Sequence, residues 1–292
     1  MQRAIAHDRA ADRGLARRRL RWRGVLAVAA LTLLSLVFLA PFAWLLVTAL
    51  KDQSELSAFP ILWWPRHPEW DNFARAVTLL PFGRYALDSL ALSAIYTVLV
   101  TLTSALVGFA FARLRGRGKR PLFIVMLATI MLPPVLTVIP TYVLYARLGL
   151  VGTYWPWVFS GLASAPFLAF LFRQFFAGMP IELEDAAIVD GCGYGRIFWQ
   201  IFLPLSAPVI ATVAILSFQG TWGDYLTPSL LLNQDNTTLA VGLATGFTDP
   251  HGFTTVNALA AGAILYVLPV IVLFFVAQRY FVQGIVTTGL KG

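Results

Sequence analysis

The feature that most constrains this chain is a series of six long apolar blocks. They lie at about 25–50, 88–114, 121–144, 155–176, 205–232 and 257–282. A helix needs about 20 predominantly apolar residues to cross a bilayer core of roughly 30 Å, since each residue adds about 1.5 Å. Lipid offers no hydrogen-bond partner to open backbone groups, so such segments must be helical. The sequence therefore predicts an all-α membrane protein with six transmembrane helices.

Composition supports this class. Of the 292 residues 58% are hydrophobic and 12% are charged, whereas a soluble domain has about 25% charged residues. The first block is longer than a signal-peptide core of about 7–15 residues, so we expect a retained span. Pro133-Pro134 should kink or break the third block. The predicted organisation is a basic segment at 1–24 followed by one membrane domain at 25–292.

Basic residues mark one side of the predicted membrane. One group precedes the first block: Arg3, Arg9, Arg13, Arg17, Arg18, Arg19, Arg21 and Arg23. Another follows the second block: Arg113, Arg115, Arg117, Lys119 and Arg120. With six spans both groups share a side with Arg173, Arg196, Arg279 and Lys291. Because basic loops stay in the cytoplasm, both termini are predicted to be cytoplasmic.

The arginine-rich start could also indicate a nucleic-acid patch. An apolar span follows it at once, which favours a topology signal in contact with anionic lipid headgroups. The sequence therefore predicts membrane lipids as a partner, and no nucleic acid.

Motifs for covalent chemistry are absent from the sequence. It contains no G-x-x-x-x-G-K-[ST] loop for ATP, no H-E-x-x-H and no G-x-S-x-G. His7, His67 and His251 fall on different segments, and Cys192 has no second cysteine to pair with. We therefore predict no catalytic residue, no metal site and no cofactor on this chain, which is not expected to be an enzyme.

Ionisable groups at membrane depth, which ion-coupled transporters need, are nearly missing. Every acidic residue except Asp224 lies at a block edge or outside the blocks. Trp222 and Tyr225 flank Asp224, as interface anchors would. Asp224 could be a solvated or capped carboxylate at the outer rim, or could help to close the outer gate of a pathway. No repeat of half the chain length is visible, which also counts against a secondary transporter.

One acidic segment, ELEDAAIVDGCGYGRIFWQIFLPL at 182–205, differs from its apolar surroundings. Its four carboxylates are Glu182, Glu184, Asp185 and Asp190. The first three fall in the first turn of a predicted helix, where the helix dipole favours negative charge. Gly191 predicts the end of that helix, because glycine adopts the left-handed conformation without penalty. A second short helix is predicted at 194–202.

This segment could lie flat on the membrane as an amphipathic linker. Such linkers are typically basic, because the inner leaflet is negative and repels carboxylates. An acidic first turn backed by Ala186 and Ala187 suits a groove on a protein partner better. The residues therefore favour a cytoplasmic helix that docks on a partner.

The same segment resembles the EAA loop of binding-protein-dependent ABC importer permeases, whose pattern is E-A-A, three residues, G, nine residues and I-x-L-P. This chain has Asp185-Ala186-Ala187, then Gly191, then Ile201-Phe202-Leu203-Pro204 at the same spacings. Aspartate replaces the first glutamate, which keeps the charge. Strings such as LPPVLTVIPTYVLYARLGLVGTYW and TWGDYL are similar to the maltose-type carbohydrate uptake family, and within its permease pair to the shorter, six-span partner.

The resemblance implies a type I ABC importer permease fold with a coupling helix at about 181–204, between spans four and five. It also implies partners: a second, different permease, two ATP-binding subunits that carry ATP and Mg²⁺, and an extracytoplasmic solute-binding protein. Carried over by position, the ATPase-docking residues are Glu184, Asp185, Ala186, Ala187, Asp190, Gly191, Ile201, Leu203 and Pro204. The sequence does not identify the residues that bind the solute.

Two functions are compatible with these features. The first is a permease subunit of an ATP-driven importer for a carbohydrate or polyol, in a bacterial or archaeal cell (inner) membrane. The second is a self-sufficient secondary transporter or channel whose acidic loop binds a regulator. The missing midplane charges and repeat favour the first. Trp63, Trp64 and Trp70 in an external stretch favour membrane anchoring over contact with the binding protein.

Overall fold

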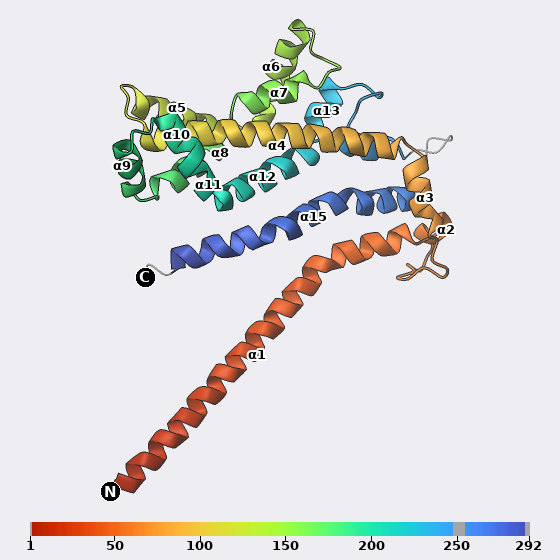
Figure 1. The fold of residues 1–292 in the computed structure, drawn as a ribbon. Coiled ribbons are helices and arrows are strands. Elements are labelled where there is room, and N and C mark those ends of the chain that lie inside the picture. Colours follow the sequence, from red (N-terminus) through yellow and green to blue (C-terminus); the bar gives the residue numbers. More distant parts are fainter. Residues whose placement is uncertain (1, 248–254, 290–292) are drawn as a thin grey trace. The chain divides into compact units, whose positions relative to one another are not determined.

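A computed structural model describes residues 2–247 and 255–289, with side chains within 24–247 and 255–278. Every regular element in these ranges is a helix (Figure 1), which confirms the all-α prediction. The chain divides into two compact units, Met1–Phe73 with Thr255–Ala261 and Ala74–Thr254 with Gly262–Gly292. The arginines before residue 24, together with Arg279 and Lys291, lie outside the described side chains.

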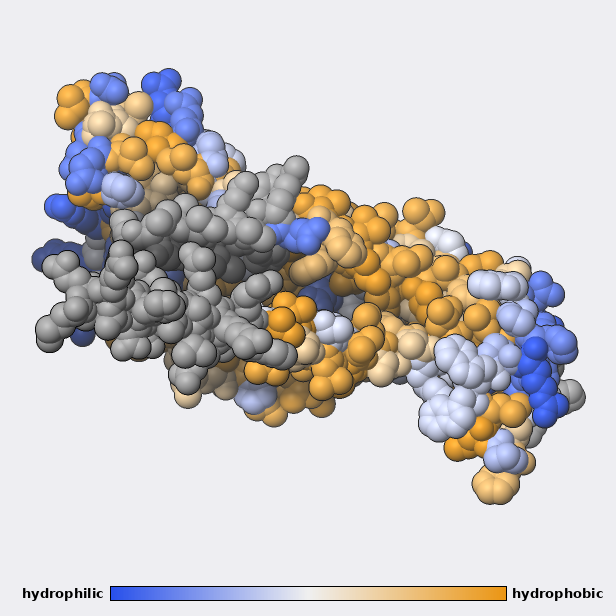
Figure 2. Space-filling model, turned by 90° about the horizontal axis from the view of Figure 1, so that it is seen from below, coloured by the Kyte–Doolittle hydropathy of each residue, from blue (hydrophilic) through white to orange (hydrophobic). Residues whose placement is uncertain are grey.

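Within the described residues, four helical segments are long and apolar enough to cross a membrane. They are Gly24–Ala49 in α1 (Gln2–Ala49), α4 (Phe82–Arg113), Trp155–Ala177, and Val256–Gln278 in α15 (Val256–Gly289). They match the first, second, fourth and sixth apolar blocks. Large apolar side chains are exposed over much of the face seen in Figure 2, as expected for a surface that meets lipid. Two bent helix pairs raise the number of candidate spans to six if each pair counts as one.

The third block is broken at its prolines, as predicted. α5 (Lys119–Ile130) and α6 (Pro134–Arg147) meet at an angle of 100°. Twelve residues give α5 a length of about 18 Å, which is too short for a bilayer core of roughly 30 Å. Of the two outcomes expected at Pro133-Pro134, a kink or a break, the structure shows the break, with two helices of different direction.

The fifth block differs from its predicted bounds at both ends. The helical run Tyr194–Leu205 precedes α12 (Ala207–Trp222) and is bent from it by 79°. Extension of the span to residue 232 is wrong, because α12 ends at Trp222 and a separate short helix, α13 (Leu226–Leu231), follows. Asp224 accepts a hydrogen bond from the N–H of Thr227 at 3.1 Å, which stabilises a new helix start at this point.

The fourth block is interrupted between α7 (Trp155–Leu162) and α8 (Pro166–Ala177). Ser164 has a positive φ of 65° in this break. Its hydroxyl lies 3.1 Å from that of Ser104 on α4, whose oxygen also accepts the N–H of Ala165 at 3.3 Å. Since lipid cannot satisfy open backbone groups, α4 supplies the partners that make the break tolerable.

Glycine allows α4 and α8 to pack closely. A Cβ built on Gly108 would lie 2.5 Å from the Cβ of Phe172 and 2.9 Å from the carbonyl oxygen of Ala169. Small residues at such crossings let two backbones approach in the way that is common between membrane helices. α4 therefore packs closely on α8, and it also contacts α7, α12 and α14.

Asparagine side chains hold the first unit together. Asn72 donates its amide to the carbonyl oxygens of Ala49 at 2.9 Å and Lys51 at 3.0 Å. Asn257, at the start of α15, donates to Asn72 Oδ1 at 3.2 Å. Both asparagines are buried, so these bonds join the end of α1 to the starts of α3 (Asp71–Thr78) and α15.

The remaining helices are short. They are α2 (Gln53–Leu56), α9 (Glu182–Val189), α10 (Tyr194–Ile197), the π-helical turn η1 (Phe198–Phe202), α11 (Leu203–Leu205) and α14 (Leu239–Thr245). α14 is joined to α4 where Ser89 Oγ accepts the N–H of Leu239 at 2.7 Å. The loop around 233–256 thus contains a packed helix, and its residues 248–254 are outside the described part of the chain.

Replacing Gly108 by alanine tests the close packing of α4 on α8. We expect Gly108→Ala to destabilise the protein by about 1–3 kcal/mol, because neither Phe172 Cβ nor the backbone can move away. Gly83→Ala is the matched control on the same helix, since its Cβ would meet nothing within 4 Å. Thermal unfolding in detergent measures both variants, and equal stability of the two would contradict the packing argument.

Candidate functional site

The acidic segment folds as the sequence predicts. α9 has Glu182, Glu184 and Asp185 in its first turn, where the helix dipole favours carboxylates. Gly191 has a φ of 79° and follows the helix end. Its N–H donates to the carbonyl oxygen of Ile188 at 3.0 Å, and the N–H of Cys192 donates to the carbonyl oxygen of Ala187 at 2.9 Å. This pair of bonds is the Schellman arrangement, so the left-handed glycine stop is confirmed.

Burial divides the predicted docking residues into two groups. Asp185, Ala186, Asp190, Gly191 and Pro204 are exposed. Glu184 and Ala187 are each only 5% exposed, and Ile201 and Leu203 are partly buried against the same apolar core. In this conformation Glu184 and Ala187 face the interior of the chain itself, which leaves the exposed group as the surface that a partner can reach.

Arg113, at the end of α4, explains why Glu184 can be buried. Its Nη1 lies 3.7 Å from Glu184 Oε2, and the two side chains are 8% and 7% exposed. Its Nη2 donates to the carbonyl oxygens of Phe176 at 2.7 Å and of Met179, and its guanidinium lies 5.0 Å from the ring centre of Phe202. A single cation therefore joins α4, the end of α8, α9 and η1.

Phenylalanines form the core on which this arginine rests. Phe109 on α4 lies 5.3 Å from Phe198, 5.1 Å from Phe202 and 5.9 Å from Phe176, measured between ring centres. All four rings are buried. Edge-on and tilted aromatic pairs at these distances add to the apolar burial. The segment after α9 thus packs against α4 and α8, the same two helices that Arg113 joins.

The second helix of the segment is longer than predicted. The sequence predicts it at 194–202, and it runs over Tyr194–Leu205 with the π-turn η1 inside it. Apolar spacing at an α-helical period cannot reveal such a turn, which is frequent near functional sites.

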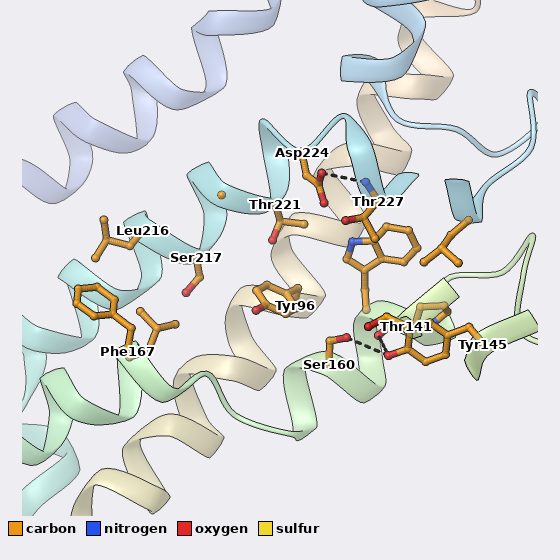
Figure 3. Close-up of a pocket in the computed structure, with 15 residues that line it drawn as sticks. Tyr96, Thr141, Tyr145, Ser160, Phe167, Leu216, Ser217, Thr221, Asp224 and Thr227 are labelled. Atoms are coloured by element: carbon orange, nitrogen blue, oxygen red, sulfur yellow. Dashed lines mark hydrogen bonds between the residues drawn. The ribbon is translucent and has the colours of Figure 1, made fainter. Parts of the chain in front are cut away.

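A second candidate site is a cavity of about 500 Å³ in the larger unit. Side chains from α4, α6, α7, α8, α12 and α13 converge on it, as Figure 3 shows. Its lining includes Tyr96, Thr141, Tyr145, Trp157, Ser160, Ser217, Thr221, Asp224 and Thr227. Aromatic faces with a few placed hydroxyl groups are typical of sites for small polyhydroxylated molecules. The sequence alone did not identify this set, because its members lie on different helices.

Asp224 lines this cavity and also caps α13. Figure 3 shows its carboxylate bonded to the N–H of Thr227, while on another wall the hydroxyls of Tyr145 and Ser160 lie 3.1 Å apart. Asp224 is thus hydrogen-bonded within the chain and also borders the cavity, and both roles expected for it stay predictions.

The interpretation of Trp222 as an interface anchor is wrong. It is 2% exposed, its ring stacks on Tyr266 with centres 5.5 Å apart, and its indole N–H donates to the Tyr266 carbonyl at 3.1 Å. Tyr225, which is 46% exposed, remains available at the surface. Among the described residues, no cluster of three His, Cys, Asp or Glu side chains could hold a metal ion.

Comparison with known proteins adds evidence on the family that does not depend on the geometry of the two sites. Residues 101–287 match the family described as binding-protein-dependent transport system inner membrane component. The arabinooligosaccharides transport system permease protein AraQ of Halalkalibacterium halodurans is 37% identical over 206 residues, 70% of this chain and 73% of that protein. The diacetylchitobiose uptake system permease protein NgcG of Streptomyces coelicolor is 32% identical over 263 residues, 89% and 86% of the two chains.

Solved structures support the fold. A chain in the crystal structure of a bacterial ABC transporter involved in the import of the acidic polysaccharide alginate has a TM-score of 0.73 and 22% sequence identity to this chain. The match covers 89% of this chain and 97% of that one. At this identity the likeness concerns the fold.

Removing the Arg113 side-chain charge should strongly destabilise the segment. We expect Arg113→Met to cost about 3 kcal/mol or more, because it leaves the buried Glu184 unpaired. A second substitution, Glu184→Met, should recover part of this loss, whereas Arg115→Met, at an exposed arginine nearby, should stay within about 0.5 kcal/mol. Chemical or thermal unfolding in detergent measures the wild type, the two single variants and the double variant, which together form a double-mutant cycle. Losses from the two single substitutions that simply add would show that the ions are not coupled.

The cap at Asp224 can be separated from its charge. Asp224→Asn keeps an oxygen that accepts the Thr227 N–H, so it should leave stability nearly unchanged. Asp224→Ala removes the cap and should cost about 0.5–2 kcal/mol. Equal unfolding midpoints for the Asn and Ala variants would mean that the hydrogen bond is not stabilising.

Proposed function

This chain belongs to the family of binding-protein-dependent transport system inner membrane components, and we propose that it is the permease subunit of an ATP-driven sugar importer. It forms half of a translocation pathway whose other half is a second, different permease. Proteins of this family are membrane transport components without catalysis of their own. ATP and Mg²⁺ are bound by two ATPase subunits, and a solute-binding protein delivers the sugar from outside.

The cavity beside α12 supports a carbohydrate or polyol as the solute. Tyr96, Tyr145 and Trp157 offer aromatic surface, and the threonine and serine hydroxyls around them offer donors and acceptors. Sugar rings use both kinds of contact. The carboxylate of Asp224 at the cavity disfavours an anionic solute. Both relatives named above are permeases for oligosaccharides or a disaccharide by their descriptions, which supports the same class.

The observation that carries the coupling role is a surface of small and acidic exposed residues on α9, a helix whose inner side is held by the contact between Glu184 and Arg113. Asp185, Ala186, Asp190 and Gly191 are exposed, while Glu184 on the same helix is paired with Arg113. A small residue such as Ala186 lets a groove on a partner approach the backbone. We infer that the ATPase docks here, on the cytoplasmic side, with both termini of this chain on that side.

The contacts of α9 with its neighbouring helices explain how a movement of the ATPase would reach the pathway. A force on α9 acts through Arg113 on α4 and the end of α8. It also acts through the helical run Tyr194–Leu205 on α12, whose residues Ser217 and Thr221 line the cavity. An ATPase that closes and opens would in this way bias the pathway between two states.

Two matched substitutions test the coupling role. Gly191 and Gly193 both have open space where a Cβ would lie, but Gly191 has a φ of 79° whereas Gly193 has −76°. Gly191→Val forces a branched residue into the left-handed region, at a cost of about 1–2 kcal/mol or more, and should distort the docking turn. Gly193→Val fits its extended backbone and should be tolerated.

The measurement is mass spectrometry of what co-purifies with the tagged chain from its own host in mild detergent. We expect an ATPase and a second permease with the wild type and with Gly193→Val, and a lower share of ATPase with Gly191→Val. A wild-type chain that purifies alone or as a homo-oligomer would overturn the importer proposal in favour of a self-sufficient transporter or channel. Equal ATPase recovery with both variants would overturn the docking surface only.

A further inference from the structure

We propose that a basic pocket at the start of α5 binds the phosphate of an anionic phospholipid headgroup. The pocket has a volume of about 310 Å³ and lies in the larger unit, apart from the cavity beside α12. Its lining residues are Phe111, Gly116, Lys119, Arg120, Phe123 and Arg173. Three of these six residues carry a positive charge, and none carries a carboxylate.

None of the three cations forms an ion pair within 4 Å in the described part of the chain, although the carboxylate of Glu184 acts on Lys119 at longer range. Lys119 Nζ donates to the Leu114 carbonyl at 2.7 Å, and Arg173 Nη1 donates to the Gln174 amide oxygen at 2.8 Å. Both acceptors are neutral. Arg173 Nε is buried and has no hydrogen-bond partner. A buried donor that stays unpaired is costly, and a phosphate oxygen is a strong acceptor for guanidinium groups.

The start of α5 adds further positive potential. Lys119 and Arg120 occupy its first turn, no acidic residue is present there, and its N-cap, Gly118, provides no side-chain cap. The positive end of a helix dipole favours anions and is disfavoured by cations. A bound anion would therefore stabilise the charges of Lys119 and Arg120 together with the open N–H groups of this turn.

Aromatic walls fix the position of the third cation. The guanidinium of Arg173 lies 4.7 Å from the ring centre of Phe123, and this ring is 5.4 Å from that of Phe111. Stacking of this kind holds a guanidinium plane in place while its edge donates. The pocket is therefore built from packed side chains of α4, α5 and α8 and is more than a basic loop.

Continuity with an apolar surface makes a lipid the occupant rather than a soluble anion or an acidic protein surface. On α5, directly after its basic first turn, Leu122, Ile124 and Val125 are 62%, 56% and 61% exposed. A phospholipid has the same order of groups, a phosphate followed by acyl chains. Basic pockets between membrane helices bind anionic headgroups, and the position of this pocket at the start of a helix with exposed apolar side chains fits that chemistry.

Native mass spectrometry of the purified full-length protein, in its complex where one forms, tests the proposal. Detergent micelles are supplemented with phosphatidylglycerol or with phosphatidylcholine of the same acyl chains. The pocket variant carries Lys119→Gln, Arg120→Gln and Arg173→Gln. The matched control carries Arg115→Gln, Arg117→Gln and Arg196→Gln, which removes the same charge from exposed positions outside the pocket.

We expect the wild type and the control variant to retain phosphatidylglycerol in preference to phosphatidylcholine, and the pocket variant to lose about tenfold or more of this binding. Equal unfolding midpoints of the two variants exclude a folding defect. Equal loss in both would overturn the proposal, since it would indicate general charge attraction. Displacement of the lipid by inorganic phosphate at equal concentration would assign the pocket to free phosphate. Unchanged lipid binding with loss of a co-purifying ATPase would assign it to that protein.

Discussion

The buried guanidinium of Arg113 is the contact on which the candidate coupling segment depends. It pairs with Glu184, bonds to the carbonyl oxygens at the end of α8 and lies over the ring of Phe202. Carbonyl groups at a helix end carry partial negative charge, so one cation pairs with a carboxylate and hydrogen-bonds a helix terminus at the same place. Without it Glu184 would be an unpaired buried charge and α9 would lose its tie to α4. Because the inner face of α9 is held in this way, its exposed face is fixed relative to α4.

Close packing around α4 extends this rigidity toward the cavity. Gly108 lets α8 approach α4, and Ser104 supplies hydrogen bonds to the break between α7 and α8. The same helix presents Tyr96 to the cavity. The single long helix α4 thus carries Arg113 at one end and contributes Tyr96 to the wall of the cavity further along.

Much of this could be predicted from local sequence signals. The helix stop at Gly191 follows from the need for a left-handed residue after Asp190, and the break at Pro133-Pro134 follows from a missing N–H and a fixed φ. The apolar block runs on to residue 232 and so conceals the end of α12 at Trp222, although Gly223, its C-cap, is a local signal for a helix end. Asp224 then accepts the N–H of Thr227 in the first turn of α13. Exposure also escaped prediction: Glu184 and Asp185 are adjacent carboxylates, and only Arg113, some seventy residues earlier in the chain, makes one of them a core residue.

The sequence by itself determined that this chain is helical and membrane-embedded, where its acidic helix starts and stops, and which family it belongs to. These properties depend on residues that are close together in the chain, such as apolar blocks of span length and the spacing of the E-A-A-type motif. Only the tertiary structure decided which motif residues remain available to a partner, which hydroxyls and rings share one cavity, and that Lys119, Arg120 and Arg173 share one pocket. Those sets come from different helices, and their assembly depends on how the helices pack, which no single segment of the sequence encodes.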